Sequence, residues 1–161
     1  MEQVMLDLET LGVSPGCAIV AIGAVRFNKE RVIDEFYYRP MWGGRLEHET
    51  VKWWLGQSDA ARAELLRSPD GSMEQGLREF LKFLGSSPVW GNGSDFDNAI
   101  LMDCYRRFSI PAWGHRQNRC YRTVRNLLDV PFSPPTIKHH AVEDARAQAV
   151  HLMAILRRMG V

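Results

Sequence analysis

The stretch Val4-Met5-Leu6-Asp7-Leu8-Glu9 carries the strongest structural signal in the chain. Its apolar start predicts a buried strand, and side chains two positions apart in a strand leave the same face. Asp7 and Glu9 therefore share one face, whereas Leu8 points into the core. Paired carboxylates after an apolar run are costly unless a cation neutralises them. Solvated acids at a strand end would show the same pattern, so the pair alone does not define a site.

The rest of the chain predicts one mixed sheet with helices on both faces. Two further strands, at 18–27 and 32–38, follow short links that predict an antiparallel meander. Short strands are predicted at 89–91 and 119–121. Helical periodicity predicts helices around 51–55, over 73–84 behind Ser72 as N-cap, from 94 to 108 behind Ser94, at 124–128 and over 141–159. This order predicts an α/β fold of three antiparallel strands followed by parallel ones.

Composition predicts a single globular domain over residues 1–161. The chain has 45% hydrophobic and 24% charged residues, which excludes a disordered or fibrous protein. Its net charge is only +1, so affinity for nucleic acid would need local segregation of charge.

The cysteines and the hydropathy of the chain indicate the cellular compartment in which we expect the protein. Cys17, Cys104 and Cys120 form no CxxC pair and are odd in number, which argues against a zinc knuckle or a disulfide framework. The longest nearly apolar run, 17–25, is too short for a membrane span, and the N-terminus does not resemble a signal peptide. We therefore expect a cytoplasmic protein without a membrane partner.

A second pair of acids lies in residues 91–98, GNGSDFDN, directly after a predicted strand. Ser94 as N-cap, with acids in the first helical turn, would explain Asp95 and Asp97 without a ligand. The glycines also allow a ligand to approach, and sheets of this type bind ligands at the carboxyl ends of their strands.

A third group, residues 139–144 with the sequence HHAVED, opens the last predicted helix. Loop histidines and first-turn acids explain each of these residues alone. The combination is more informative, because four carboxylates from separate places and a histidine are what two-metal phosphoryl transfer needs. Two hard cations take oxygen ligands, and a base of near-neutral pKa deprotonates the attacking water.

In order and in context, three motifs resemble those of the DEDDh 3′-5′ exonucleases: Asp7-Leu8-Glu9-Thr10, Phe96-Asp97, and His139 with Asp144 five residues later. That superfamily includes polymerase proofreading subunits, ribonuclease T and oligoribonuclease. The resemblance spans nearly the whole chain, and it selects Asp97 over Asp95 and His139 over His140. The Trp53-Trp54 region looks more like the small single-domain bacterial and phage exonucleases.

The resemblance implies an RNase H-like fold and release of nucleoside 5′-monophosphates from single-stranded 3′ ends of RNA or DNA. It implies two Mg²⁺ ions, with Mn²⁺ as a possible substitute. Asp7, Glu9 and Asp144 would hold the first ion, and Asp7 with Asp97, largely through water, the second. His139 would be the general base. Relatives are often homodimers, so a homodimer is possible here.

Further substrate contacts are predicted from the resemblance and from charge. Thr10, Leu11 and Phe96 resemble positions that contact the 3′-terminal nucleotide. Trp53 lies off the apolar stripe of its helix and is a candidate for base stacking, whereas Trp54 is predicted to be core. Between positions 104 and 128 the chain has no acid and six arginines, which predict a phosphate-binding strip: Arg106, Arg107, Arg116, Arg119, Arg122 and Arg125.

Two other functions remain compatible with the sequence. A non-catalytic RNase H-like binding module would be expected to lack at least one acid or the histidine, and none is missing. A metal-dependent endonuclease or phosphatase could use the same carboxylates. The sequence does not distinguish RNA from DNA, because recognition of the 2′-OH depends on one or two contacts.

Overall fold

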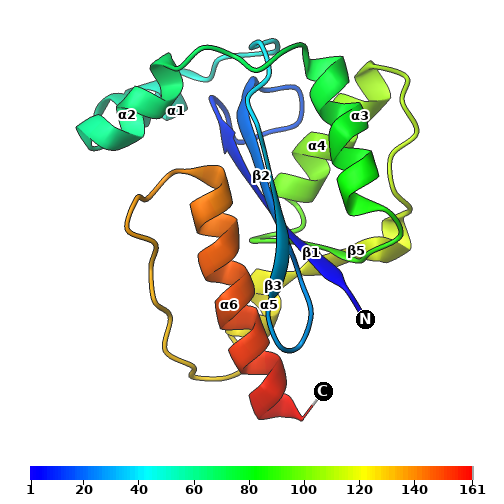
Figure 1. Cartoon of the computed structure of the whole chain (residues 1–161). Coiled ribbons are helices and arrows are strands. Elements are labelled where there is room, and N and C mark those ends of the chain that lie inside the picture. The colour runs from blue at the N-terminus through cyan, green and yellow to red at the C-terminus, as the bar shows by residue number, and fades with distance from the viewer. Residues whose placement is uncertain (161) are drawn as a thin grey trace.

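The computed structural model describes residues 1–160 and contains a five-stranded sheet with helices on both faces (Figure 1). The strands lie in the order β3-β2-β1-β4-β5. Their bounds are β1 Gln3–Thr10, β2 Ile19–Phe27, β3 Val32–Tyr38, β4 Val89–Gly91 and β5 Asn118–Cys120. β2 is antiparallel to β1 and to β3, whereas β4 is parallel to β1 and to β5. The predicted α/β class and mixed sheet are confirmed. Val161, the last residue of the expected domain, lies outside the described residues.

The helices connect and cover the strands. Their bounds are α1 His48–Leu55, α2 Asp59–Leu66, α3 Met73–Leu84, α4 Asp97–Arg107, α5 Tyr121–Arg125 and α6 Ala141–Met159, with a 3₁₀ turn η1 at His115–Gln117. α3 and α6 have the predicted bounds. The Ser72 hydroxyl caps α3 by accepting the N–H of Gln75, as its sequence predicts. No helix among residues 1–160 is long and apolar enough to cross a membrane.

Three details differ from the sequence-based expectation. α2 was not predicted, although the Ser58 hydroxyl caps it by accepting the N–H of Ala61. Ser94 does not cap α4, because a turn in which Phe96 donates to the carbonyl of Gly93 delays the helix to Asp97. β5 and α5 begin one and three residues earlier than the strand at 119 and the helix at 124 that the sequence predicted.

The central strand β1 is covered on both faces, and its alternation separates two cores. Val4, Leu6 and Leu8 pack with α3 and α4, whereas Met5 packs with α6 on the opposite face. Because side chains alternate along a strand, Asp7 and Glu9 share the face of Met5. The acids of β1 therefore face the N-terminal end of α6.

A glycine allows α6 to approach that face closely. Gly23 on β2 is the partner of Asp7 in the β1–β2 ladder. A Cβ at Gly23 would collide with the backbone of Ala141 and Val142, the first residues of α6. The missing side chain therefore lets the first turn of α6 rest on the sheet beside Asp7, and it brings Asp144 towards β1.

The short helix α1 is fixed to the end of β1. The buried Trp54 indole donates a hydrogen bond of 2.9 Å to the carbonyl of Thr10, and it packs with Leu11, Ala18 and Val20. The prediction that Trp54 is core is confirmed, since only 2% of it is exposed. Trp53, its neighbour, is 46% exposed and lies beside the acids.

We predict that Gly23→Ala destabilises the fold and reduces activity together. Overpacking a tight backbone contact costs about 1–3 kcal/mol, and here it also moves the start of α6 away from Asp7. Gly43→Ala is the control, because a Cβ at Gly43 meets nothing within 4 Å. Denaturant unfolding and a nuclease assay on both variants check this prediction, and equal stabilities would contradict it.

Candidate active site

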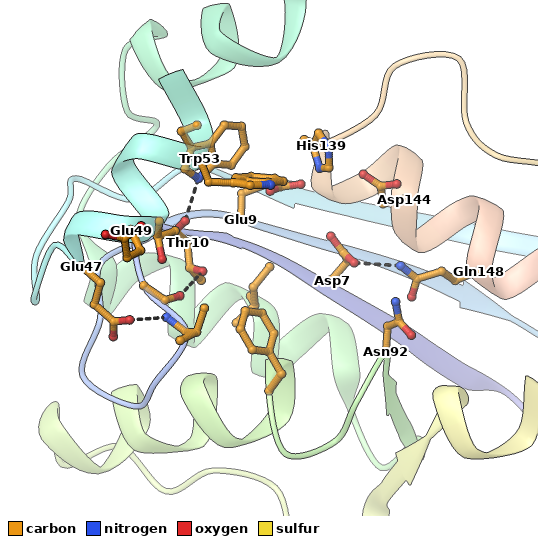
Figure 2. Close-up of a pocket in the computed structure, with 16 residues that line it drawn as sticks. Asp7, Glu9, Thr10, Glu47, Glu49, Trp53, Asn92, His139, Asp144 and Gln148 are labelled. Carbon is orange, nitrogen blue, oxygen red and sulfur yellow. Dashed lines mark hydrogen bonds between the residues drawn. The ribbon is translucent and has the colours of Figure 1, made fainter. Parts of the chain in front are cut away.

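The acids of the three motifs meet at the end of β1, where the starts of α4 and α6 approach the strand (Figure 2). Asp7 and Glu9 come from β1, Asp144 from the first turn of α6, and His139 from the loop directly before it. All four line a cleft of about 590 Å³. Other lining residues come from β1, α1, the β4–α4 loop and α6, among them Thr10, Glu47, Glu49, Trp53, Phe96 and Gln148.

Asp97 lies beneath the other acids and is only 3% exposed. Its Oδ1 accepts the N–H of Leu8 and its Oδ2 accepts the N–H of Asn92, both at 3.1 Å. Burial raises the pKa of Asp97 to about 7, although these backbone donors and the nearby Arg122 favour its charged form. The first residue of α4 is thus joined to β1 at the acidic pair.

The remaining carboxylates also bind protons more tightly than isolated acids do. Burial, then the charges of Asp97, Glu9 and Asp144, raise the pKa of Asp7 well above its ordinary value, although Gln148 donates to its Oδ1 at 2.8 Å. Burial, then Asp144, Asp97 and Glu64, raise the pKa of Glu9 in the same way. Burial also raises the pKa of Asp144. In the absence of a cation these charges repel one another.

The donor set fits a hard divalent cation. Glu9, His139 and Asp144 each offer a ligand atom, and these atoms lie within 4.8 Å of one another. Gln148 Oε1 and Asn92 Oδ1 are buried without a hydrogen-bond partner among the described residues, and both residues line the cleft. Carboxylate and amide oxygens are the ligands that Mg²⁺ and similar cations take. Positive charge here would stabilise the charged forms of the buried acids, and it would offset the repulsion that helps to raise the pKa of Asp7 and Glu9.

The structure separates the two adjacent histidines. His139 lines the cleft. Its ring contacts the rings of Trp53 and Trp54 edge-to-face, with centroids 4.8 Å and 5.9 Å apart. His140 stacks on Tyr37 and does not line the cleft. The geometry therefore presents His139, the residue that the motif selects, to the acids.

The predicted nucleotide contacts are placed unevenly. Thr10, Phe96 and the exposed Trp53 line the cleft. The Thr10 hydroxyl donates to the carbonyl of Gly12, and the Thr10 carbonyl accepts the Trp54 indole N–H. Leu11 does not line the cleft, because its side chain is buried in the apolar cluster beneath α1.

The predicted arginine strip does not enter the cleft as a whole. Arg106 and Arg107 on α4 pair with Asp103, which lies just before the acid-free segment. Arg116 and Arg119 are exposed on η1 and β5, and neither lines the cleft. Arg122 is nearer, since its Nη2 donates to the carbonyl of Asn92 at 2.7 Å. The structure thus connects one arginine of the strip to the cleft through a lining residue.

Sequence analysis assigned no role to Asn92 or Gln148, which both line the cleft. Gln148 lies one helical turn after Asp144, so helical spacing places the two on one face. Asn92 gave no signal, because its position depends on the β4–α4 turn. His151, farther along α6, is buried between Tyr121 and the carbonyl of Val130.

Comparison with solved structures supports a nuclease fold. Exonuclease X in complex with 5′-overhanging duplex DNA has 16% identity and a TM-score of 0.64, and the match covers 99% of this chain and 93% of that one. The nuclease domain of 3′hExo, a DEDDh family member bound to rAMP, has 15% identity and a TM-score of 0.61, with 99% and 92% covered. Cell-death related nuclease 4 has 13% identity and a TM-score of 0.58, with 99% and 64% covered. None of the curated proteins compared with the chain matches it significantly.

The fold and the cluster of acids with a histidine define a DEDDh-type 3′-5′ exonuclease. The family model of the 3′-5′ exoribonuclease Rv2179c-like domain matches residues 2–156, and the chain belongs to this family. The resemblance seen in its three motifs is thereby confirmed.

The raised pKa values predict that the metal-free protein loses stability as the pH rises. Between about pH 4 and 7 the folded cluster binds protons that the unfolded chain has released, so the free energy of unfolding falls across this window. Asp7→Asn removes one repelling charge. We expect it to flatten this dependence and to raise the free energy of unfolding at pH 8.

Urea unfolding in excess chelator at pH 5 and pH 8 checks this prediction. Carboxylates outside the cluster titrate alike in the variant and the unaltered protein, so their contribution cancels in the difference between the two free energies of unfolding. Parallel pH profiles for the two proteins would contradict the electrostatic explanation.

Proposed function

We propose that this exonuclease hydrolyses single-stranded RNA from the 3′ end and releases nucleoside 5′-monophosphates by a two-metal-ion mechanism. The observation that supports the proposal most directly is that Asp7, Glu9, Asp144 and His139 line one cleft, with Asp97 buried close to Asp7 and Glu9. The exoribonuclease family that matches the chain favours RNA over DNA. The 3′hExo domain, which shares the fold, is bound to rAMP.

The acids would hold the two cations in the arrangement that the motifs imply. Asp7, Glu9 and Asp144 would bind one ion, and Asp7 with Asp97 the other. When bound, the cations supply positive charge that stabilises the attacking and leaving oxygens of the reaction. Gln148 orients Asp7 by donating to its Oδ1, and the two backbone donors orient Asp97. Mg²⁺ is the preferred ion in this proposal because every carboxylate ligand is a hard oxygen, and Mn²⁺ is the expected substitute.

His139 would act as the general base. A ring nitrogen takes a proton from the attacking water, the water oxygen bonds to phosphorus, and the P–O3′ bond breaks. The leaving 3′ oxygen takes up a proton, so the products are a nucleoside 5′-monophosphate and a strand one residue shorter. Trp53 and Trp54 contact the ring edge-to-face, which restrains its orientation over the cleft.

The cleft also suggests how a strand lies in it. Trp53, Phe96 and Thr10 all line the cleft, and the two aromatic residues offer ring faces for the terminal base. Glu47 and Glu49 lie at the α1 end, opposite Asp7 and Gln148. Negative charge there disfavours a phosphate and suits a nucleoside with a free 3′-OH. The phosphates of the remaining strand would then run towards Arg122, with Arg116 and Arg119 farther along.

Three further expectations rest on the sequence alone. A homodimer, a cytoplasmic location and the absence of a membrane partner remain predictions. Cys17, Cys104 and Cys120 are free thiols, which suits a reducing compartment.

We predict degradation of single-stranded RNA labelled at its 5′ end into a ladder that shortens one residue at a time. Mg²⁺ or Mn²⁺ should support the reaction, whereas excess chelator or Asp7→Asn should abolish it, because either change disrupts cation binding. A DNA strand of the same sequence is the matched substrate and should be degraded more slowly. Internal fragments would favour an endonuclease, and full activity in chelator would exclude the metal mechanism.

We predict that His139→Ala lowers kcat by about 10²–10⁴-fold, the usual contribution of a general base. Cation and RNA binding should be retained, because the acids and aromatic residues remain. Single-turnover rates and calorimetric titration with Mg²⁺ measure the two effects separately. If Mg²⁺ affinity falls as steeply as kcat, His139 is a metal ligand and the assigned role is wrong.

A further inference from the structure

The general-base candidate has an unusual backbone. His139 adopts a φ of +61°, in the left-handed region that side chains other than glycine rarely occupy. Such a conformation is energetically unfavourable and persists only where surrounding contacts impose it. His139 itself has edge-to-face contacts with two tryptophans, and its neighbour His140 has further contacts that restrain the loop.

His140 supplies that restraint. Its ring stacks on the Tyr37 ring of β3, with centroids 4.6 Å apart and planes 19° apart. Its Nε2 lies 3.8 Å from Oε2 of Glu64 on α2, and both side chains are more than four-fifths buried. The imidazole is therefore held between a strand and a helix that the sequence places far from it.

Glu64 is itself fixed in place. Its Oε2 accepts a hydrogen bond of 3.0 Å from the Tyr37 hydroxyl, and Arg67 donates to both of its oxygens at 3.1 and 3.2 Å. Tyr37, Glu64 and His140 thus form a closed cluster, which we call the histidine clamp. Each member contacts the other two.

The histidine clamp acts on the peptide that joins the two histidines. The His140 N–H donates to Oδ2 of Asp144 at 3.2 Å, and the His140 carbonyl accepts the N–H of Asp144 at 3.0 Å. Because the ring and the backbone of His140 both have fixed contacts, the peptide between His139 and His140 has little freedom to rotate. The left-handed conformation of His139 is then the geometry that sends its ring into the cleft.

We propose that Tyr37, Glu64 and His140 are positioning residues for the exonuclease reaction, and that they act by holding His139 over the acids. This inference rests on the proposed role of His139 as general base. None of the three lines the cleft. Their effect should therefore appear in kcat and not in KM, because misplacement of a catalytic group slows the chemical step without removing substrate contacts.

We predict that His140→Ala lowers kcat about tenfold and changes KM by less than about twofold. The expected loss of kcat is smaller than the roughly 10²-fold loss that a misplacement of about 1 Å can cause. His140→Phe keeps the stack on Tyr37 and should restore most of kcat. Tyr37→Phe keeps the ring and loses only the bond to Glu64, so it should fold and show a smaller loss of kcat. It tests the proposal even if His140→Ala fails to fold.

His151→Ala is the matched control. Like His140, His151 contacts a tyrosine ring, here that of Tyr121, but His151 is buried within α6 and outside the cleft. The variant His151→Ala should lower the thermal unfolding midpoint without lowering kcat. Every kinetic assay is run well below the lowest unfolding midpoint of the variants compared. If His140→Ala and His151→Ala lose kcat equally, the effect is a general loss of packing and the proposal is overturned.

The double variant His139→Ala/His140→Ala shows whether the histidine clamp acts through His139. We expect its kcat to equal that of His139→Ala alone, because there is then no base to position. A further tenfold loss would overturn the proposal. Loss of activity in His139→Ala with full kcat in His140→Ala would overturn the positioning role alone. Full kcat in His139→Ala would overturn both the general base and the histidine clamp.

Discussion

The burial of four neighbouring carboxylates is the constraint that organises this protein. Burial raises the pKa of Asp7, Glu9, Asp97 and Asp144, and the charges of the other acids raise it further in Asp7 and Glu9. A fold selected for stability alone would separate these charges. The structure instead brings them together at a cost in stability, and a bound cation would restore stability by offsetting their charge.

Several contacts hold the acids in place despite this cost. The N–H groups of Leu8 and Asn92 fix Asp97, and the side-chain amide of Gln148 fixes Asp7. Gly23 lets α6 lie against β2 directly beside the acidic pair. Leu8, Gly23 and Gln148 belong to strands or to α6, and Asn92 directly follows β4, so the site is not built on long loops.

The loop before α6 is the exception, and its conformation depends on distant residues. It carries His139, and the stack of His140 on Tyr37 ties it to the outer strand of the sheet (Figure 1). Glu64 adds a connection to α2, and it also contributes to the raised pKa of Glu9. Glu64 is thus a member of the histidine clamp whose charge also acts on Glu9. The helices α1 and α2 therefore do more than cover the end of the sheet.

The sequence by itself determined the features that depend on local periodicity and on ordered motifs. The alternation in β1 predicted that Asp7 and Glu9 share a face, and the period of α6 predicted its bounds. The motifs identified the exonuclease superfamily and preferred His139 to His140. Tertiary structure alone decided that Asp97 lies beneath the cleft, that Leu11 is buried, and that Arg106 and Arg107 pair with Asp103. It also decided how Tyr37, Glu64 and His140 meet. A local pattern cannot specify such contacts, because they depend on how closely segments distant in sequence approach one another once the whole core has packed.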